Sequence, residues 1–342
     1  MIIVYNKEKT NFKEINHALS IQMEEYYNDI GKASITLPID DYKVSAIENG
    51  GIIYDTVRDM SFVIRNYKYD TAKNTITVNA YTCNRLLNKR AIAQKNAITN
   101  IEIGVRSVIE SNLRGLPNVE IGELNGFEDS TETILYGGQI LDGIMPILEV
   151  AKIGNRMRWD ADRRVHVFEL YKGRDLTTGI HSVAFSEEYK TAKDLVIASD
   201  DSVFKNVIFV PGTLKDDAET EIVVEVGTAT GDERFEKWLN SSFRQDEEET
   251  ELQFRERLKQ IGLEEIAKLV RRHTFSVSID TKEYGIAYKL GDVVSCVSRR
   301  FGVELNSRIT SVKYTLDISG EKINLILGEP ILTALREVKL IG

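Results

Sequence analysis

The sequence has few of the residues that build metal centres and disulfide frameworks. Its 342 residues include two cysteines and four histidines. Cys83 and Cys296 lie far apart and match neither a zinc spacing nor a disulfide framework, so we expect two buried or half-buried free thiols in a cytosol-made protein. No histidine has a cysteine or carboxylate at a known metal or hydrolase spacing. Surface or strand positions are therefore expected for all of them: His17, His166, His181 and His273.

Long hydrophobic runs and an excess of basic charge are also missing. The runs at 2–5 and 222–224 are far shorter than the roughly 18 residues that cross a bilayer, so we expect no membrane insertion. The start of the chain has no basic region and no small-residue cleavage site, which predicts no signal peptide. The net charge of −9 argues against a protein that grips nucleic acid, because such proteins usually carry a basic footprint. DNA that slides past without binding is compatible with this charge.

The composition is that of a folded protein. Hydrophobic residues make up 42% of the chain and charged residues 28%, a balance typical of soluble globular domains with a real core. The length predicts two or more domains. Many short strands with few helices indicate an α+β fold that is mainly β, with barrels or sandwiches rather than a βαβ arrangement.

The first part of the chain is typical of β structure. Ser34–Leu37 is a short strand that Pro38 stops. The segment 61–69 is a longer strand, and 70–74 has the composition of a turn. Apolar residues then alternate with polar ones over 75–80, which predicts a hairpin with one buried face.

Helical patterns appear in the middle of the chain. Thr99 and Glu102 have the spacing of a capping box at the start of a helix. A second helix is expected over 139–152, where Pro146 implies a kink. The segment 156–170 predicts another hairpin.

Strands return near residue 203 and are followed by the longest helical stretch. Strands are expected over 203–210 and 222–226, and a short helix around 233–239. An acidic connector at 246–251 precedes a helix that extends to about residue 272. Alternating strands then continue to about residue 328.

No motif in the chain predicts catalysis or cofactor binding. A Gly-x-Ser-x-Gly elbow, a Walker loop and a dinucleotide fingerprint are all missing. Gly137-Gly138 precedes a helix and could cradle an anion, but no Lys-Ser/Thr accompanies it. The 53 acidic residues make carboxylate pairs uninformative about glycosidase chemistry.

Other candidate features also have ordinary explanations. Asp246–Glu249 is interpreted as a solvated connector that favours a helix N-terminus, because the oxygen spacing of a calcium hand is missing. Asn240-Ser241-Ser242 matches a glycosylation sequon, but without a secretory signal we interpret it as chance. Trp159 and Trp238 could be sugar platforms, although core or interface packing is favoured. We therefore assign no catalytic, cofactor-binding or metal-ligating residue, which favours a structural or interaction role.

Several stretches of the chain follow one another in a distinctive order and spacing over residues 1–330. They are Tyr27–Pro38, Ser61–Ile64, Ile76–Tyr81 with Arg85–Arg90, Gly173–Thr177, Val203–Val210, Leu290–Val294, Arg308-Ile309 and Ile323–Gly328. In this order and spacing they resemble the hub proteins of phage tails, in particular the tail-associated family of phages and prophages of Gram-positive bacteria.

The resemblance implies a phage baseplate hub-like fold with two related β-barrel domains, an inserted α+β segment and a helical segment. The expected domains are these: a first barrel at 1–95, which strands near 183–200 complete; an inserted α+β domain at 96–195; a second barrel at 196–228 and 273–330; a helical insertion at 229–272; and a C-terminal tail at 331–342. Only this tail follows the second barrel, so we expect no lytic domain and no enzymatic activity.

The resemblance also implies an assembly and its partners. Three chains would place six barrels in a ring that matches a six-fold tail tube on one side and a three-fold spike or fibre complex on the other. The expected partners are two further copies of the chain, the tail tube or distal tail protein, the tape measure protein, and the tip spike or fibre proteins. DNA would pass transiently through the ring, and the protein would belong to the virion tail assembled in the host cytoplasm.

Two other functions remain open. A module that binds a receptor or a cell-wall carbohydrate at the tail tip would attach the phage to its host, and exposed aromatic residues on one face would favour it. A tail endopeptidase or other peptidoglycan-degrading enzyme would need a site hidden among ordinary residues.

Overall fold

The computed structural model of the protein describes residues 1–39, 46–215, 221–240, 243–269, 272–279, 282–300 and 302–328. The chain divides into two compact units. The described residues up to Ile197 and from Phe275 onward form unit 1, and Ala198–Thr274 form unit 2. The predicted tail at 331–342 lies outside the described residues. In the described ranges, no helix is both long and apolar enough to span a membrane.

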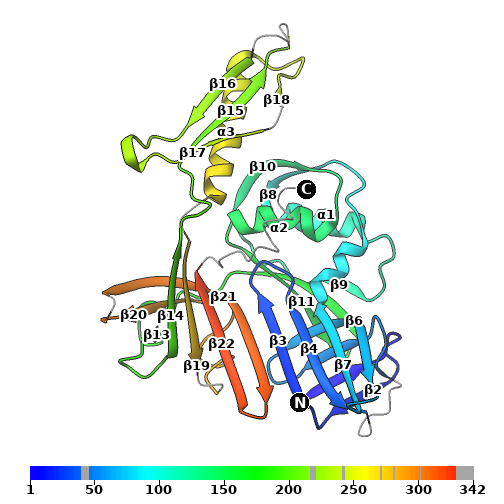
Figure 1. Ribbon diagram of the computed structural model, residues 1–342. Helices are drawn as coiled ribbons and strands as arrows, with labels where there is room; N and C mark the ends of the chain where they lie inside the picture. Colours follow the sequence, from blue (N-terminus) through cyan, green and yellow to red (C-terminus); the bar gives the residue numbers. More distant parts are fainter. Residues whose placement is uncertain are drawn as a thin grey trace. The chain divides into compact units, whose positions relative to one another are not determined.

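Unit 1 contains a sheet of 13 strands. The described strands are hydrogen-bonded in the order β14-β19-β22-β21-β3-β4-β7-β6-β5-β1-β2, with β20 attached to β21 and β13 attached to β20 (Figure 1). Their bounds are β1 (Ile2–Tyr5), β2 (Phe12–Ile15), β3 (Ser20–Tyr26), β4 (Lys32–Pro38), β5 (Ile52–Asp55), β6 (Met60–Asp70), β7 (Thr75–Thr82), β13 (Ala184–Phe185), β14 (Lys193–Asp200), β19 (Arg272–Ile279), β20 (Val293–Ser298), β21 (Val303–Asp317) and β22 (Gly320–Gly328).

Strand β21 pairs with strands from both the N-terminal and the C-terminal part of the sequence. Its first part, Val303–Arg308, pairs with β20, and its second part, Ser311–Leu316, pairs with both β22 and β3. The C-terminal strands therefore continue the N-terminal sheet. Among the described strands the order is open and no closed barrel is found, which differs from the two barrels that we predicted. The pairing of β3 with β21 joins segments at opposite ends of the sequence, and local patterns carry no signal for it.

The core of this sheet draws on both ends of the chain. Met23 and Phe62 come from the N-terminal strands, and Phe275, Val312 and Leu325 from the C-terminal ones, and all are at most 1% exposed. Burying side chains of this size stabilises the fold by roughly 1.5–3 kcal/mol each. The predicted hairpin of β6 and β7 is confirmed, and the alternation along β7 buries every second residue.

An α+β segment of unit 1 follows β7. Its apolar core contains both helices, including the buried Val105, Ile109 and Ile144. The antiparallel β11–β12 pair confirms the predicted hairpin. The elements are the 3-10 helix η2 (Cys83–Lys89), β8 (Asn96–Asn100), α1 (Ile101–Asn112), β9 (Val119–Ile121), β10 (Ser130–Leu135), α2 (Ile140–Val150), β11 (Gly154–Asp160) and β12 (Val165–Tyr171).

The start of α1 differs from the predicted capping box. Asn100 is the N-cap, and its side chain accepts a hydrogen bond from the backbone N–H of Ile103. The carboxylate of Glu102 instead accepts from the backbone N–H groups of Asn125 and Phe127. Burial raises the pKa of this carboxyl, but these hydrogen bonds outweigh the effect and the net shift is downward. Glu102 thus fixes the loop that follows β9, a tertiary role that the local spacing does not reveal. The second predicted helix is confirmed as α2, with Pro146 inside it.

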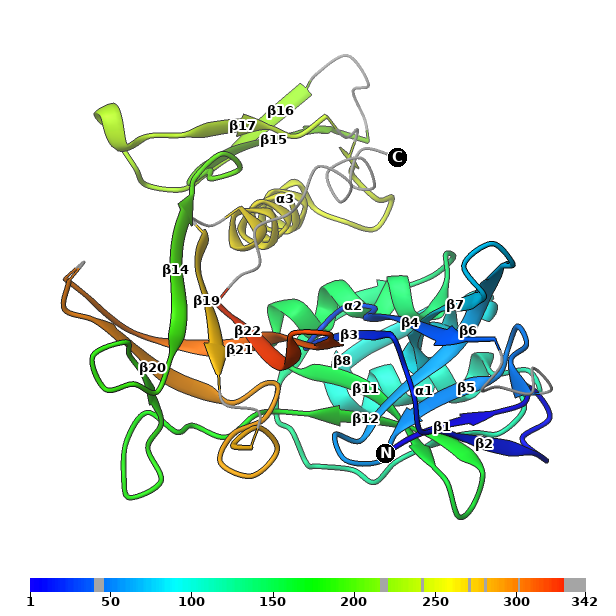
Figure 2. The same cartoon turned by 60° about the horizontal axis from the view of Figure 1, so that its bottom comes forward.

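Unit 2 is a smaller sheet that packs on one helix. Its sheet has the order β16-β15-β17, with β18 also paired to β15. Helix α3 covers one face of this sheet, where Phe254 and Leu258 are fully buried (Figure 2). The elements are β15 (Val207–Thr213), β16 (Glu221–Val226), the 3-10 helix η3 (Gly231–Glu233), β17 (Glu236–Trp238), β18 (Phe243–Arg244) and α3 (Glu251–Lys268).

Unit 2 departs from the predicted layout in three places. The prediction of a short helix over 233–239 is wrong, because this segment forms the end of η3 and strand β17. Helix α3 ends at Lys268 rather than near residue 272. Strands β15 and β16, which we had assigned to the second barrel, pair with each other and with β17. The smaller sheet thus includes strands on both sides of the expected boundary at residue 229.

Tyr27 is the point where four segments of unit 1 meet. Its hydroxyl donates to the backbone carbonyl oxygens of Lys152, at 2.8 Å, and Tyr171, at 3.2 Å. The guanidinium of Arg308 lies 4.9 Å from the centre of its ring and also donates to the carbonyl oxygen of Gly291. The ring leaves no space for a side chain at Gly154, where a Cβ would lie 2.3 Å from it.

Two motifs that are distant in the sequence lie against each other beside Tyr27. A Cβ at Gly173 would lie 1.8 Å from the carbonyl oxygen of Gly291. Next to them, the guanidinium of Arg174 forms a 2.6 Å ion pair with the Asp292 carboxylate, which also accepts from the Arg174 backbone N–H. The Gly-Arg-Asp and Leu-Gly-Asp stretches of the sequence therefore form a single contact.

We predict that Gly173→Ala destabilises the protein, because the added Cβ would overlap the backbone of Gly291. Overpacking of this kind costs about 2–3 kcal/mol in the free energy of unfolding. Urea denaturation followed by circular dichroism measures this loss. Gly143→Ala is the control, because only the flexible end of Ile92 lies within 4 Å of its Cβ. Equal stability of the two variants would contradict the contact.

Candidate functional site

The predicted free thiols are confirmed. Cys83 and Cys296 are both free and buried, and burial raises the pKa of each thiol to about 12. Neither is therefore poised as a nucleophile at neutral pH.

The histidines are not brought together. His17 and His181 are exposed, whereas His166 is buried on β12 beside the ring of Trp159, at 4.9 Å. Burial lowers the pKa of His166 to about 3, so its imidazole is neutral. The backbone of His273 lies in β19, and its side chain is outside the described set. Within the described ranges, no group of three or more candidate ligands could hold a metal ion.

The Gly137-Gly138 pair forms a turn before α2. The N–H of Gly137 donates to the carbonyl oxygen of Ile92, and the carbonyl oxygen of Gly138 accepts from the N–H of Ile92. The side-chain oxygen of Asn88 accepts from the N–H of Leu141 at the helix start. These internal contacts use backbone groups that an anion site would require.

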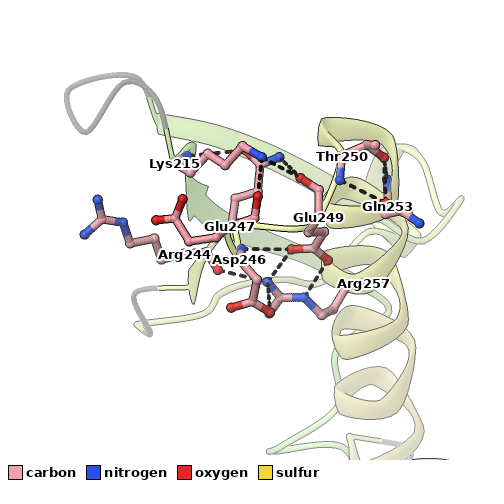
Figure 3. A network of polar contacts seen from close by, with 9 residues as sticks. Lys215, Arg244, Asp246, Glu247, Glu249, Thr250, Gln253 and Arg257 are labelled. Carbon is pink, nitrogen blue, oxygen red and sulfur yellow. Dashed lines mark hydrogen bonds and ion pairs between the residues drawn. The ribbon is translucent and has the colours of Figure 1, made fainter.

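The acidic connector before α3 is partly built into unit 2 (Figure 3). Asp246, Glu247 and Glu248 are exposed, as predicted for a solvated connector. Glu249 instead accepts two hydrogen bonds from Arg257, at 2.9 and 2.8 Å, and they lower its pKa. A capping box of Thr250 and Gln253 starts the helix. The connector thus fixes the helix start, and Ser241 and Ser242 of the sequon lie outside the described residues.

The two tryptophans have different surroundings. Trp159 is 1% exposed and packs edge-on against Tyr5, which confirms core packing. Trp238 is 47% exposed and stacks on Phe209, with ring centres 6.1 Å apart. Phe209 and Trp238 are register partners in β15 and β17.

Unit 1 contains a polar cleft of about 580 Å3. It is bounded by β3, the turn between β5 and β6, strand β11, the end of β12 and the loop 284–292. Tyr27 and the Gly173–Gly291 contact hold several of these segments together. We define this space as the unit 1 cleft.

Most of the basic side chains around the unit 1 cleft form ion pairs. Six basic side chains line it, and five of them form ion pairs with carboxylates. Lys289 is the sixth and forms no ion pair with a described residue. The five pairs are Arg58–Asp55, Arg156–Glu169, Arg158–Glu169, Lys172–Asp129 and Arg174–Asp292.

Two polar groups in the cleft wall lack partners among the described residues. Glu25 lies on the same face of β3 as the buried Ile21 and Met23, and its carboxylate forms no hydrogen bond or ion pair there. Asn155 is 1% exposed, and its side-chain N–H group has no acceptor. Its side-chain oxygen accepts from Asn84, at 3.0 Å. Leaving the buried N–H of Asn155 without a partner costs about 1–3 kcal/mol. Glu25 is only partly buried, but it lines the same cleft, so both groups are candidates for a ligand contact.

Burial raises the pKa of Glu25 to about 8. Nearby Asp59 and Asp55 add to this increase, and Arg156 opposes it. Glu25 is not among the residues predicted from the sequence, although the sequence carries a signal for it. Along β3 the inward-facing positions are Ile21, Met23 and Glu25, so a carboxylate stands where the alternation calls for an apolar residue.

Three solved structures share this fold over almost their whole length. Prophage tail protein gp18 from Listeria monocytogenes EGD-e is 15% identical with a TM-score of 0.55, over 99% of this chain and 98% of that one. The tail protein from Neisseria meningitidis MC58 is 12% identical with a TM-score of 0.61, over 96% of each chain. The 43 kDa tail protein of prophage MuSo2 from Shewanella oneidensis is 11% identical with a TM-score of 0.56, over 95% and 97%.

The fold is therefore one found in phage and prophage tail proteins, and it is mainly β with few helices. The chain belongs to the siphovirus tail family described as Siphovirus ReqiPepy6 Gp37-like protein, whose sequence model matches residues 1–329. The predicted membership of a phage tail family is thus confirmed. Among curated proteins, none matches the sequence significantly.

We predict that Glu25→Gln stabilises the protein at high pH. Folding raises the pKa of Glu25 from 4.5 to about 8. The protonated side chain therefore contributes fully to the free energy of unfolding below pH 4.5, and this contribution is lost as the pH rises toward 8. The neutral amide avoids this loss, so the Tm of the variant should exceed that of the original by about 2–4 °C at pH 9. The two should be equal near pH 4.5. Differential scanning calorimetry across this range measures the difference.

Glu24→Gln is the matched control for this prediction. Glu24 is the neighbouring residue on β3 and its side chain pairs with Lys32 at 3.7 Å, on the other face of the strand. We expect no gain at high pH from this change. A pH-independent effect of Glu25→Gln would contradict the raised pKa.

Proposed function

We propose that the protein forms a ring-shaped hub of the phage tail tip, which joins the tail tube to the tip or spike and lets DNA pass. The observation that carries this proposal is the match of the whole chain, in sequence family and in fold, to phage tail proteins. A tail-protein family implies a component of the virion tail.

The sheet of unit 1 supports this proposal in its layout. We propose that strands β1–β7 and strands β19–β22 act as the two related β units of each subunit, in place of two closed barrels. Three subunits would then contribute six such units to one ring, which suits a six-fold tube above and a three-fold spike below. The described order of the sheet leaves β2 and β14 at its edges, and edge strands are surfaces where subunits can pair.

The partners in this proposal are the tail tube or distal tail protein, the tape measure protein, and the tip spike or fibre proteins. The net charge of −9 suits a ring whose lumen repels DNA and lets it slide, if acidic side chains line the lumen. We further propose that assembly takes place in the host cytoplasm.

We predict that the purified protein forms trimers at high concentration. Native mass spectrometry should give three times the chain mass of 38.7 kDa, and negative-stain microscopy should show rings with a central hole. Adding the distal tail protein should increase the trimer fraction if that partner completes the ring. Monomers at every concentration, with and without this partner, would rule out the hub.

A second candidate function is binding of a cell-wall carbohydrate. The half-exposed Trp238, stacked on Phe209, lies on the face of the unit 2 sheet opposite α3. Arg234 lies 5.7 Å from the centre of the Phe209 ring and pairs with Glu225 and Glu236. An exposed aromatic face beside charged hydrogen-bonding groups is an arrangement that suits a sugar ring.

If this second function holds, we expect Trp238→Ala to abolish co-sedimentation of the protein with purified host cell walls. Leu252→Ala is the control, because Leu252 is another exposed apolar residue of unit 2, at 72% exposure. Equal co-sedimentation of the two variants, or none for the original protein, would eliminate Trp238 as a carbohydrate contact.

We propose that the protein has no peptidoglycan-degrading activity of its own. Its family membership and its whole-chain similarity to tail proteins support this view. A zymogram on host peptidoglycan, with and without a chelator, should show no clearing. A cleared band at the mass of the chain would establish a tail endopeptidase instead.

A further inference from the structure

We propose that the unit 1 cleft binds a basic peptide segment of another protein, whose lysine or arginine side chain pairs with Glu25 while a backbone carbonyl accepts from the side-chain N–H of Asn155. This inference does not depend on the ring, because a single unit 1 contains the whole cleft.

The charge balance of the cleft favours a cation. Five of its six basic side chains already form ion pairs, and Lys289 forms none with a described residue. The carboxylate of Glu25 has no such partner among the described residues. Arg156 acts on Glu25 as a positive charge, and Asp59 and Asp55 oppose it as negative charges. An ammonium or guanidinium group is the chemistry that would stabilise the ionised Glu25.

The hydrogen-bonding groups of the cleft favour a peptide over a free amine. The buried N–H of Asn155 requires an acceptor, and a cation alone offers none. A peptide supplies a carbonyl oxygen within a few ångström of its own side chains. A peptide with a lysine or arginine residue therefore carries both kinds of group that the cleft lacks, a cation for Glu25 and an acceptor for Asn155.

The rim of the cleft offers apolar contacts to the peptide residues on either side of the basic residue. Val57 is 71% exposed and Ile286 is 81% exposed, and both line the cleft. Large side chains in so exposed a position gain stability when a partner covers them. The volume of about 580 Å3 lies within the range typical of ligand pockets. The cleft therefore suits a short extended segment with one basic residue between apolar ones.

The test uses the full chain and two blocked tripeptides, acetyl-alanine-lysine-alanine-amide and the same peptide with norleucine in place of lysine. They match in length but differ in the ammonium group. Ligand-observed NMR titration at pH 8.5, where Glu25 is largely ionised, should show that the lysine peptide binds at least about tenfold more tightly. n-Butylamine, which lacks the carbonyl groups, should bind more weakly than the lysine peptide.

Variants connect this preference to the proposed contacts. Glu25→Gln should reduce the preference for lysine to about twofold or less, because the amide carries no charge. Glu24→Gln on the opposite face of β3 should keep it, because Glu24 pairs with Lys32 outside the cleft. Asn155→Ala should weaken both peptides by the same factor and leave n-butylamine unchanged.

Each other result overturns part or all of the proposal. Equal binding of the two peptides, or a preference that survives Glu25→Gln, would remove the cation contact. n-Butylamine binding as tightly as the lysine peptide would reduce the site to a small-amine pocket. No binding of either peptide at about 10 mM would exclude a peptide site. These outcomes are independent of whether trimers form, so failure here leaves the hub proposal intact.

Discussion

Close packing around Tyr27 constrains several segments of unit 1. Its ring occupies the space that a side chain at Gly154 or Gly291 would need, and Arg308 lies over it. Its hydroxyl donates to the carbonyl oxygen of Tyr171, where β12 ends. One side chain therefore fixes the N-terminal sheet, the α+β segment and a C-terminal loop to each other. Because close-packed interiors tolerate little change in volume, these segments keep a defined spacing.

The unit 1 cleft follows from this constraint. The segments that Tyr27 holds together do not close completely over β3, so an inward-facing strand position remains open to solvent. A carboxylate at that position, Glu25, costs less than it would in a sealed core, yet it is desolvated enough to raise its pKa. Asn155 adds a buried donor without an acceptor. Both groups line the same cleft, and a buried donor without an acceptor calls for an explanation.

Unit 2 is stabilised by a different and more local set of interactions. Helix α3 packs Phe254 and Leu258 on the sheet, and Gly212 and Gly262 allow the close approach of the two layers. The Glu249–Arg257 pair fixes the turn that starts the helix. The face of the sheet opposite α3 leaves Trp238 half exposed. Unit 2 thus combines a local apolar core with an exposed aromatic side chain.

Local elements of this protein can be predicted from the amino-acid sequence. The alternation along β7 and the hairpin of β11 and β12 depend on neighbouring residues, and so does the capping of α3. The pairing of β3 with β21, and the presence of Glu25 and Asn155 in one cleft, become visible only in the folded chain. Local patterns show whether a strand buries a face, whereas pairing between distant strands depends on shape and packing across the whole chain.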